Sequence, residues 1–355
     1  MCKTTEMKGI TSFRIILYTA FFLMMAGTLD AQETKIDSLL RRGDFLRMEY
    51  RFEESLGAYR EALEIAEDSA YMQTDSLKRL EVSDRLLLSE NGRSMAAYAD
   101  KPVVVAKHKF STEDFFLYYP LPDKSWRATP NQLDTMKSKG FSKALYAPDP
   151  SWEIYYSAED ADGIRNIYMT ELEDTIWTYP ALLNENLTSA ANEIYPMLSP
   201  DGKSLYFASE GLYGMGGYDL YVSRWDNETQ DWGAPVNMGF PYSSPADDML
   251  LVNTADGEYT IFASNRDCSA DSVWVYVLEF DSMPVRHAVE DPAELRKLAS
   301  LDPVGANERM DGTATIKADI PENVDIRRYM DKMTEVRSLR DSISRYGAQL
   351  DSDRN

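Results

Sequence analysis

The spacing of apolar residues divides the chain into three parts. Through residues 35–99 apolar residues return every three or four positions without a proline, which predicts a helical segment at residues 32–99. Short runs rich in Tyr, Val, Ile and Phe fill residues 110–285, with turn residues between them, and predict antiparallel strands. The helical spacing returns after residue 321. We therefore expect a β-rich body with helices on both sides.

The N-terminal helical segment is similar to a pair of tetratricopeptide helices. In such a pair, small residues let two antiparallel helices approach closely and aromatic residues fill the groove between them. Residues 51–66 match the second helix of this repeat, and residues 75–98 offer a degenerate second pair. An ordinary amphipathic hairpin without a peptide groove is the alternative. The residues at the repeat spacing are Leu39, Gly43, Leu46, Phe52, Ser55, Tyr59 and Ala62.

The β-rich part of the chain repeats itself. An aliphatic residue followed by tyrosine occurs four times, at intervals of 50, 53 and 55 residues. In three copies a β-rich run stands 11 or 12 residues before this pair, which predicts a hairpin. Three copies are followed by Trp and then Pro, which we interpret as an outer strand. The pairs are Leu117-Tyr118, Ile167-Tyr168, Leu220-Tyr221 and Val275-Tyr276.

An Asp-Gly pair stands between two predicted strands in the third and fourth copies, at Asp201-Gly202 and Asp256-Gly257. This pair favours a tight hairpin turn in which both central residues have positive φ. Each copy then forms one four-stranded antiparallel sheet, and such sheets arranged radially make a β-propeller of about four blades at residues 100–288. A closed ring, an open arc and closure through a dimer are all compatible with this pattern.

The third copy carries a more specific resemblance. Leu198–Ser209 is similar to the TolB-type propeller repeat, a Pro-Asp relative of the WD repeat, and Gly216–Tyr221 and Trp232–Asn237 resemble the form found in exported and outer-membrane-associated proteins of Bacteroidota. The resemblance implies a propeller preceded by tetratricopeptide helices. The second copy has Pro150 in place of the turn glycine, and the fourth has Ala255 in place of the proline.

Residues 1–31 have the features of a secretory signal peptide. Lys3, Lys8 and Arg14 form a basic stretch, and residues 15–26 are mostly apolar but too few to span a bilayer. We expect cleavage between Ala31 and Gln32, with an uncleaved anchor as the alternative. Cys2 would leave with this peptide. The mature chain would then keep only one thiol and form no internal disulfide.

The C-terminal helical pattern is a narrow apolar stripe. We expect a linker with a short helix at residues 289–320, followed by an amphipathic helix at residues 321–355. The stripe is spaced 3, 4, 3 and 4 residues apart, which suits packing along another helix. That helix either docks on a partner or packs on the protein itself. The stripe consists of Val336, Leu339, Ile343, Tyr346 and Leu350.

The charge balance argues against nucleic-acid binding. The 355 residues include 37 Lys and Arg against 59 Asp and Glu, a formal net charge of −22. Phosphate backbones bind through clustered cations, so a chain this acidic repels them. Apolar residues make up 44% of the sequence, close to the average for folded globular proteins.

The sequence lacks the usual catalytic and metal-binding motifs. His108 and His287 are the only histidines, and no HExxH, GxSxG or P-loop motif occurs. Gly214–Gly217 lies between two predicted strands, so we interpret it as a flexible hairpin rather than a dinucleotide-binding loop. Asp160–Gly163 has too few spaced carboxylates for a calcium loop and is expected to be a solvated turn. We therefore expect no cofactor and no metal.

Two acidic positions occur at matching places in two copies. Glu193 and the pair Asp247-Asp248 precede equivalent predicted strands, which favours a repeated role in turn geometry over a unique active site. A hydrolase that uses two carboxylates stays open as a minor alternative. It requires two buried acids whose pKa values are shifted in opposite directions.

We therefore expect a non-enzymatic exported scaffold. By the resemblance, it would be located in the periplasm or at the periplasmic face of the outer membrane and would bind other envelope proteins, with homo-oligomerisation as a further possibility. Aromatic side chains at blade ends are candidate contact residues, and the first choices are Tyr213, Tyr218 and Trp225. The alternative is a module that binds a glycan or a peptide at the mouth of the central channel.

Overall fold

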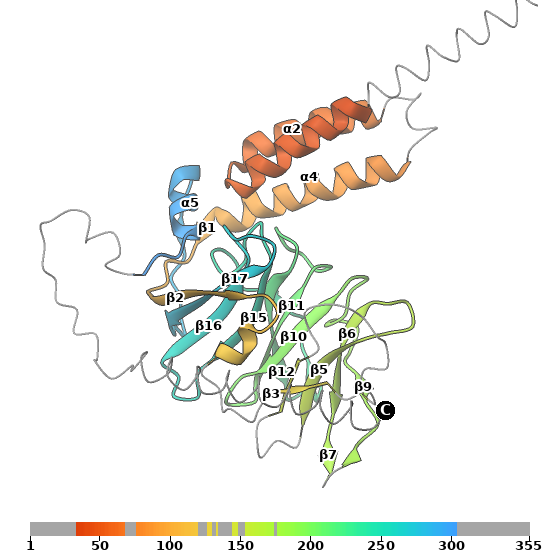
Figure 1. The fold of residues 1–355 in the computed structure, drawn as a ribbon, viewed down its shortest axis with the longest axis vertical. Helices are drawn as coiled ribbons and strands as arrows, with labels where there is room; N and C mark the ends of the chain where they lie inside the picture. Colours follow the sequence, from red (N-terminus) through yellow and green to blue (C-terminus); the bar gives the residue numbers. More distant parts are fainter. Residues whose placement is uncertain are drawn as a thin grey trace, which may run out of the picture.

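The structure is a computed structural model, and three helices lie at one end of a β-rich body (Figure 1). It describes residues 33–67, 76–119, 126–129, 133, 144–147, 153–173 and 176–303. The expected signal peptide, its cleavage site at Ala31-Gln32 and the C-terminal helix at residues 321–355 lie outside these residues. In the part of the chain that is described, no helix is both long and apolar enough to cross a membrane.

The three helices pack closely because small residues face their neighbours where the helices meet. The first helix covers residues 33–48, and it is followed by α2 (Phe52–Ala66) and α4 (Ser76–Ala96). A methyl group on Gly43 would lie 2.3 Å from the ring of Tyr59, and Ser55 Oγ lies 2.8 Å from Ser89 Oγ. The small residues therefore allow the close approach that the spacing predicts. Membership of the tetratricopeptide class stays a prediction.

The third repeat is an antiparallel sheet in chain order. Its strands are β10 (Glu193–Leu198), β11 (Ser204–Ser209) and β12 (Asp219–Asp226), and two short strands, β13 (Asp231–Trp232) and β14 (Val236–Asn237), both pair with β12. Tyr206 faces Val222 across the β11–β12 ladder. The predicted hairpin and the strands around Trp232 and Pro235 are therefore observed in this repeat.

The fourth repeat takes its outermost strand from an unexpected place. Its sheet runs from β15 (Asp248–Asn253) through β16 (Tyr259–Ser264) and β17 (Ser272–Glu279) to β2 (Val104–Ser111). β2 precedes the first aliphatic-Tyr pair, and it pairs antiparallel with β17 so that His108 faces Val275. The beginning and the end of the β-rich region are thereby joined in one sheet.

The described repeats lie side by side as an arc. In the second repeat β5 (Ile154–Glu159) pairs with β6 (Arg165–Thr170), which pairs with β9 (Ala181–Leu182). β10 of the third repeat lies between β5 and β15 of its neighbours (Figure 1). Two short pairs complete the described strands: β3 (Trp126–Ala128) with β4 (Ala144–Tyr146), and β7 (Leu172–Glu173) with β8 (Ile176–Trp177). The protein is thus mainly β with flanking helices, and a closed propeller stays a prediction.

The first copy departs from the predicted strand pattern. Its Leu117-Tyr118 pair lies in a 3₁₀ helix, η1 (Phe115–Tyr118), and not in a strand. Phe115 is fully buried, with its ring centroid 5.8 Å from that of Tyr195, and the Tyr119 hydroxyl donates to the Leu250 carbonyl oxygen at 2.8 Å. This segment therefore packs across the first strands of the third and fourth repeats instead of extending along them.

The residues that η1 covers lie at matching bulges. Tyr195 and Leu250 have positive φ angles of 51° and 50°, and the register shifts beside each of them in β10 and β15. A non-glycine residue with positive φ is strained and persists only where packing holds it. Both side chains are buried together with Phe115, so packing holds them in this conformation.

The Asp-Gly turns differ from the predicted geometry. Gly202 and Gly257 have φ angles of 70° and 72°, whereas Asp201 and Asp256 are not among the residues with positive φ. In the third repeat, Asp201 Oδ1 instead accepts from Ser199 Oγ at 2.6 Å and from the Lys203 amide at 3.1 Å. The aspartate is therefore a side-chain acceptor that closes the turn, and only the glycine needs the left-handed conformation.

The helices and the β-rich body share one core. β1 (Tyr98–Ala99) pairs with β18 (His287–Ala288), and α5 (Pro292–Ala299) begins at an N-cap in which Asp291 Oδ1 accepts from the Ala293 amide. The described part of the segment predicted at 289–320 as a linker with a short helix therefore does contain a helix, which is packed into the fold. Buried residues of this shared core include Tyr50, Phe52, Met215, Phe240, Leu295 and Ala299.

Candidate binding site between the helices and the third repeat

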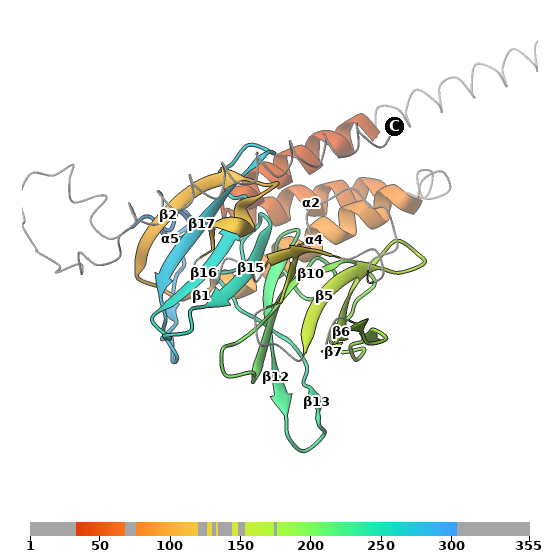
Figure 2. The same cartoon turned by 60° about the horizontal axis from the view of Figure 1, so that its bottom comes forward.

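The structure does not bring the three predicted contact residues together. Tyr213 is 57% exposed in the loop before β12, on the side of the helices, and Trp225 is 36% exposed near the opposite end of that strand. Trp225 packs edge-to-face on Trp232 at 5.3 Å, in the β12–β13 hairpin that projects away from the helices in Figure 2. Tyr218 is partly buried against the main β core. Tyr213 is therefore the one that lines a pocket.

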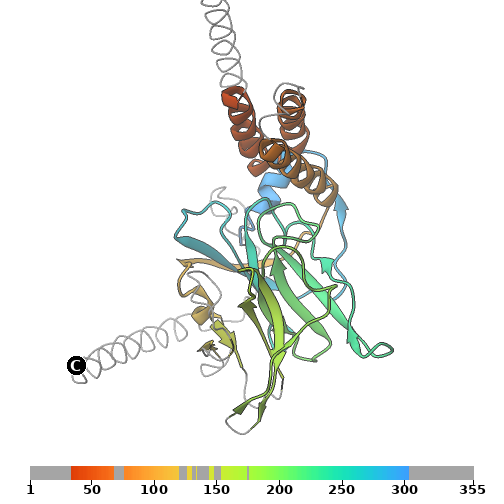
Figure 3. The ribbon, with the colours of Figure 1, turned by 90° about the vertical axis from the view of Figure 1, so that its right-hand side faces the viewer.

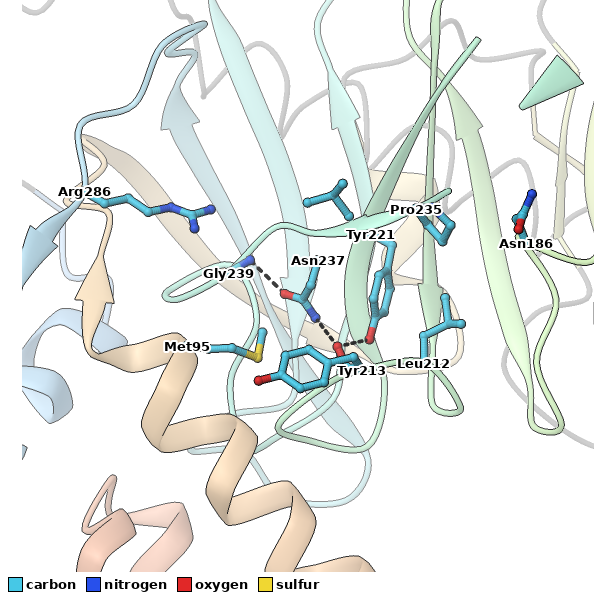
Figure 4. Close-up of a pocket in the computed structure, with 10 residues that line it drawn as sticks. Met95, Asn186, Leu212, Tyr213, Tyr221, Pro235, Asn237, Gly239 and Arg286 are labelled. Carbon is cyan, nitrogen blue, oxygen red and sulfur yellow. Dashed lines mark hydrogen bonds between the residues drawn. The ribbon is translucent and has the colours of Figure 1, made fainter. Parts of the chain in front are cut away.

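A pocket of about 490 Å³ lies where α4 meets the third repeat (Figure 4). Met95 comes from the end of α4, Tyr213 from the loop before β12, and Asn237 from β14. Arg286 reaches the pocket from the segment that leads to β18. Parts of the sequence that are far apart therefore build it, and its volume is in the range of a small ligand or a few side chains.

Hydrogen bonds to the backbone fix the walls of the pocket. The Tyr213 carbonyl oxygen accepts from the Tyr221 hydroxyl at 2.7 Å and from Asn237 Nδ2 at 3.2 Å, and Asn237 Oδ1 accepts from the Gly239 amide at 2.8 Å (Figure 4). Burial raises the pKa of Tyr221, so its hydroxyl stays protonated and remains a donor. The Tyr213 backbone is thus held while its ring stays exposed.

The pocket combines apolar surface with a few polar groups. Val236 on its rim is 63% exposed, and Met95, Leu212 and Pro235 add apolar lining. Arg286 Nη2 donates to the Met238 carbonyl oxygen at 3.0 Å, which holds the guanidinium at the side of the pocket. Such a surface can take an apolar or aromatic side chain and hydrogen-bond a polar group next to it.

The glycine-rich loop beside the pocket is held in place by its surroundings. Asp219 Oδ2 accepts from the Met215 and Gly216 amides, each at 2.9 Å. A methyl group on Gly216 would lie 2.2 Å from the Ala246 carbonyl oxygen, so the backbone packs too closely there for any other residue. Gly214–Gly217 thus joins the two strands of a hairpin, as predicted, and hydrogen bonds and close packing hold it in place.

This loop is where the helices contact the third repeat. Asn91 Nδ2 on α4 donates to the Gly214 carbonyl oxygen at 2.8 Å, and Arg47 Nη1 on the first helix donates to the Met215 carbonyl oxygen at 2.7 Å. The Met215 side chain is fully buried in the shared core. The helices consequently sit in a defined position against the pocket, at one end of the molecule (Figure 3).

The matched acids have the repeated structural role that their spacing predicts. Glu193 faces Ser209, and Asp248 faces Ser264, at equivalent positions of the two sheets. Glu193 Oε1 accepts from Ser189 Oγ at 2.6 Å, and Asp248 Oδ2 accepts from Ser244 Oγ at 2.8 Å, in each case from the serine four residues earlier.

Three ionisable side chains, Asp219, Asp248 and Arg266, lie buried beneath the helices. Asp248 pairs with Arg266, which also donates to the Pro241 carbonyl oxygen at 2.9 Å. Burial and the nearby charge of Asp248 raise the pKa of Asp219 to about 8, and burial also raises the pKa of Asp248. The two pKa values are shifted in the same direction, and both carboxyl groups are covered. They therefore lack the opposed shifts that the hydrolase alternative requires.

The turn at Asp160–Gly163 closes on itself. Asp160 Oδ1 accepts from the Asp162 amide at 2.9 Å and from the Ile164 amide at 3.0 Å. In the described residues, no group of three His, Cys, Asp or Glu side chains is placed to hold a metal ion.

Comparisons with known proteins give only distant similarities. No protein-family model and no curated protein matches this sequence. A protein described as TolB from Agrobacterium tumefaciens is 20% identical, with a TM-score of 0.28, and the match covers 43% of this chain and 50% of that one. A puromycin-hydrolyzing peptidase from Mycobacterium tuberculosis is 15% identical, with a TM-score of 0.21, over 44% of this chain and 30% of that one. This chain thus spans half or less of the length of these structures.

The sequence pointed to Tyr213 but not to the rest of the pocket. Asn237 belongs to the stretch Trp232–Asn237, whose pattern assigns it to the repeat but does not indicate a pocket. Arg286 and Met95 belong to no repeat or motif. They meet the third repeat only through the β1–β18 pair and the packing of α4. These contacts join distant parts of the chain, so the spacing of nearby residues does not predict them.

Proposed function

We propose that this protein is a non-enzymatic interaction scaffold and that a partner protein docks at the pocket between α4 and the third repeat. The observation that carries the proposal is the combination of exposed apolar side chains, Tyr213 and Val236, with walls fixed by backbone hydrogen bonds. Contact surfaces of this kind bind well because little order is lost when the partner arrives. On this account the repeats are blades of a TolB-type propeller and the helices belong to the tetratricopeptide class.

We place this function outside the cytoplasm. The basic and apolar pattern of residues 1–31 supports export, and an exported chain would act in the periplasm or at the outer membrane. The partner would then be another envelope protein. The acidic charge of the chain supports a protein partner rather than a nucleic acid.

The experiment is quantitative co-purification from the native envelope fraction after crosslinking. Tyr213→Ala and Val236→Asp are compared with Tyr179→Ala, which removes another exposed tyrosine from the second repeat. A partner that docks in the pocket is recovered about tenfold less with the first two variants, because truncation of a central contact residue costs that much affinity. Equal recovery with all three variants would contradict the proposal.

The pocket also favours a second candidate function, the binding of a short peptide or a glycan. Tyr213 and Tyr221 supply rings with the Asn237 amide beside them, and Asn186 adds a second amide at the far side of the pocket (Figure 4). Titration of the mature chain with peptide and glycan libraries separates the two functions. A ligand that Tyr213→Ala weakens supports this candidate, and no binding in either library leaves the scaffold as the function.

A further inference from the structure

The outer face of α4 carries a row of exposed leucines. Leu77, Leu80 and Leu87 are 76%, 57% and 55% exposed, and the exposed Asp84 stands between the last two. These four positions are spaced 3, 4 and 3 residues apart, so they lie along one face of the helix. We call them the α4 stripe.

The remaining contacts of α4 explain why this stripe is left open. Ser89 meets Ser55 of α2, and Gly92 lies against the ring of Phe52. On another side, Lys78 pairs with Asp37 at 2.9 Å and Arg85 with Asp44 at 3.1 Å, both on the first helix. Two faces of α4 are thus used within the helical segment, and nothing in the described ranges covers the leucines.

A helical stack of this kind usually ends in a polar face. In repeat proteins each helix pair buries its apolar face against the next, and the last helix is polar outside to keep the protein soluble. α4 is the last helix of its segment, but its outer face carries an apolar row. Such a face is typical of a helix that packs against a further helix of the stack.

The same chain contains a segment with the matching pattern. Val336, Leu339, Ile343, Tyr346 and Leu350 repeat the 3 and 4 spacing of the α4 stripe over one more turn. A polar residue within such a row fixes the register of two paired helices, and Asp84 is that residue on α4. The two rows are therefore complementary in period and apolar character.

The charges of the two segments offer one contact. Residues 336–350 contain three basic residues and one acidic residue, whereas α4 contains four basic and three acidic residues. Glu81 already pairs with Lys78 and Arg85 on its own helix. The exposed Asp84 of the α4 stripe is therefore the acid next to which a cation of the C-terminal segment can lie.

The chain is long enough for the two segments to meet. Residues 304–335, 32 residues, connect the last described residue with the first residue of the C-terminal row. A flexible chain of this length spans about 30 Å on average. Fully extended, 32 residues span up to about 110 Å, which is more than three times the length of about 30 Å of the 21-residue α4.

We propose that residues 336–350 dock as a helix on the α4 stripe of the same chain. This docking adds one further helix to the stack and covers the three leucines. The tether keeps the local concentration of the segment high, so the contact forms within one molecule before a second copy can compete. The inference does not depend on the pocket beside the third repeat.

Hydrogen exchange of the full mature chain tests this contact. Peptides from residues 76–88 and 336–350 are expected to exchange about tenfold more slowly than unstructured peptides. Leu80→Glu and Leu339→Glu each abolish the protection of residues 336–350. Leu182→Glu, which alters an exposed leucine on β9, leaves it unchanged.

Three results would overturn the inference. The first is free exchange of residues 336–350 in the unaltered chain, and the second is protection that survives Leu80→Glu. The third is protection that depends on protein concentration together with a dimer mass in sedimentation, which identifies a second copy as the occupant. Because Leu80 and Leu182 are both exposed, circular dichroism of these variants separates loss of docking from loss of folding.

Discussion

Gly216 shows how much of the junction depends on one missing side chain. Its backbone lies against the carbonyl oxygens of Ser244 and Ala246, and a Cβ atom would be 2.3 Å and 2.2 Å from them. Backbone atoms cannot rotate away as the end of a flexible side chain can. The glycine-rich loop can therefore reach the next repeat, and receive Arg47 and Asn91 from the helices, only with glycine at this position.

Gly216→Ala is expected to lower the free energy of unfolding by about 1–3 kcal/mol, because the backbone must move to admit the methyl group. Gly57→Ala is the matched control, since a Cβ atom at Gly57 in α2 meets nothing within 4 Å. The control should raise the free energy of unfolding by about 0.5–1 kcal/mol. Urea unfolding of both variants measures the difference, and equal values would contradict the tight packing of this loop.

Asp219 makes stability depend on pH. Its pKa is about 8 in the folded protein, well above that of an exposed aspartate, because burial and the charge of Asp248 favour the protonated form. Between pH 4 and 8 the folded state therefore holds a proton that the unfolded state has lost. The contribution of Asp219 to stability is present at low pH and falls as the pH rises toward 8.

Asp219→Asn removes this titration while it keeps an oxygen that can accept from the Met215 and Gly216 amides. From pH 5 to 7, the free energy of unfolding of the unaltered protein should fall relative to that of the variant, by up to about 1.4 kcal/mol per pH unit. Urea unfolding at a series of pH values gives this difference. A difference that stays constant with pH would show that Asp219 does not titrate in this range.

At the scale of elements, η1 is where the sequence pattern and the fold disagree most clearly. Leu117-Tyr118 matches the aliphatic-Tyr pair of the strands, but Phe115 and Tyr119 on either side find partners across two sheets. The hairpins of the third and fourth repeats were predictable because each depends on neighbouring residues. β2 and η1 were not predictable, because the strand that begins at residue 104 and the 3₁₀ helix that begins at residue 115 contact partners more than 70 residues away.

The candidate site likewise has one part that the sequence predicts and one part that it does not. Tyr213 was predictable as an exposed ring in a loop between strands, whereas its pocket depends on Met95 and Arg286, which only the tertiary fold brings near. The position of the Asp-Gly turn was predicted correctly, but the φ angle of its aspartate was not. The carboxylate of Asp201 offers the backbone an acceptor that a simple two-residue turn lacks.

Phe115→Ala tests the role of η1. The ring fills a site between the bulges of β10 and β15, so its removal leaves a cavity and should lower the free energy of unfolding by about 3–5 kcal/mol. Phe45→Ala, at an exposed position of the first helix, should change it by less than about 0.5 kcal/mol. Similar values for the two variants in thermal or urea unfolding would show that η1 is not part of the core.

At the scale of the whole molecule, the helices and the repeats behave as one body. The β1–β18 pair, α5 and the bonds from Arg47 and Asn91 tie the helical segment to the sheets at several places. A scaffold needs this property, because a surface built from α4 and the third repeat keeps its shape only if the two do not move apart. The pocket is thus a product of the whole fold rather than of one repeat.

Site-specific photocrosslinking in the native host tests the central claim most directly. A photoreactive phenylalanine analogue replaces Val236 at the rim of the pocket in one strain and Tyr179 on the second repeat in another. We predict a crosslink to one defined envelope protein from position 236, which Tyr213→Ala in the same chain suppresses, and no such crosslink from position 179. No crosslink from position 236, or the same products from both positions, would contradict the account.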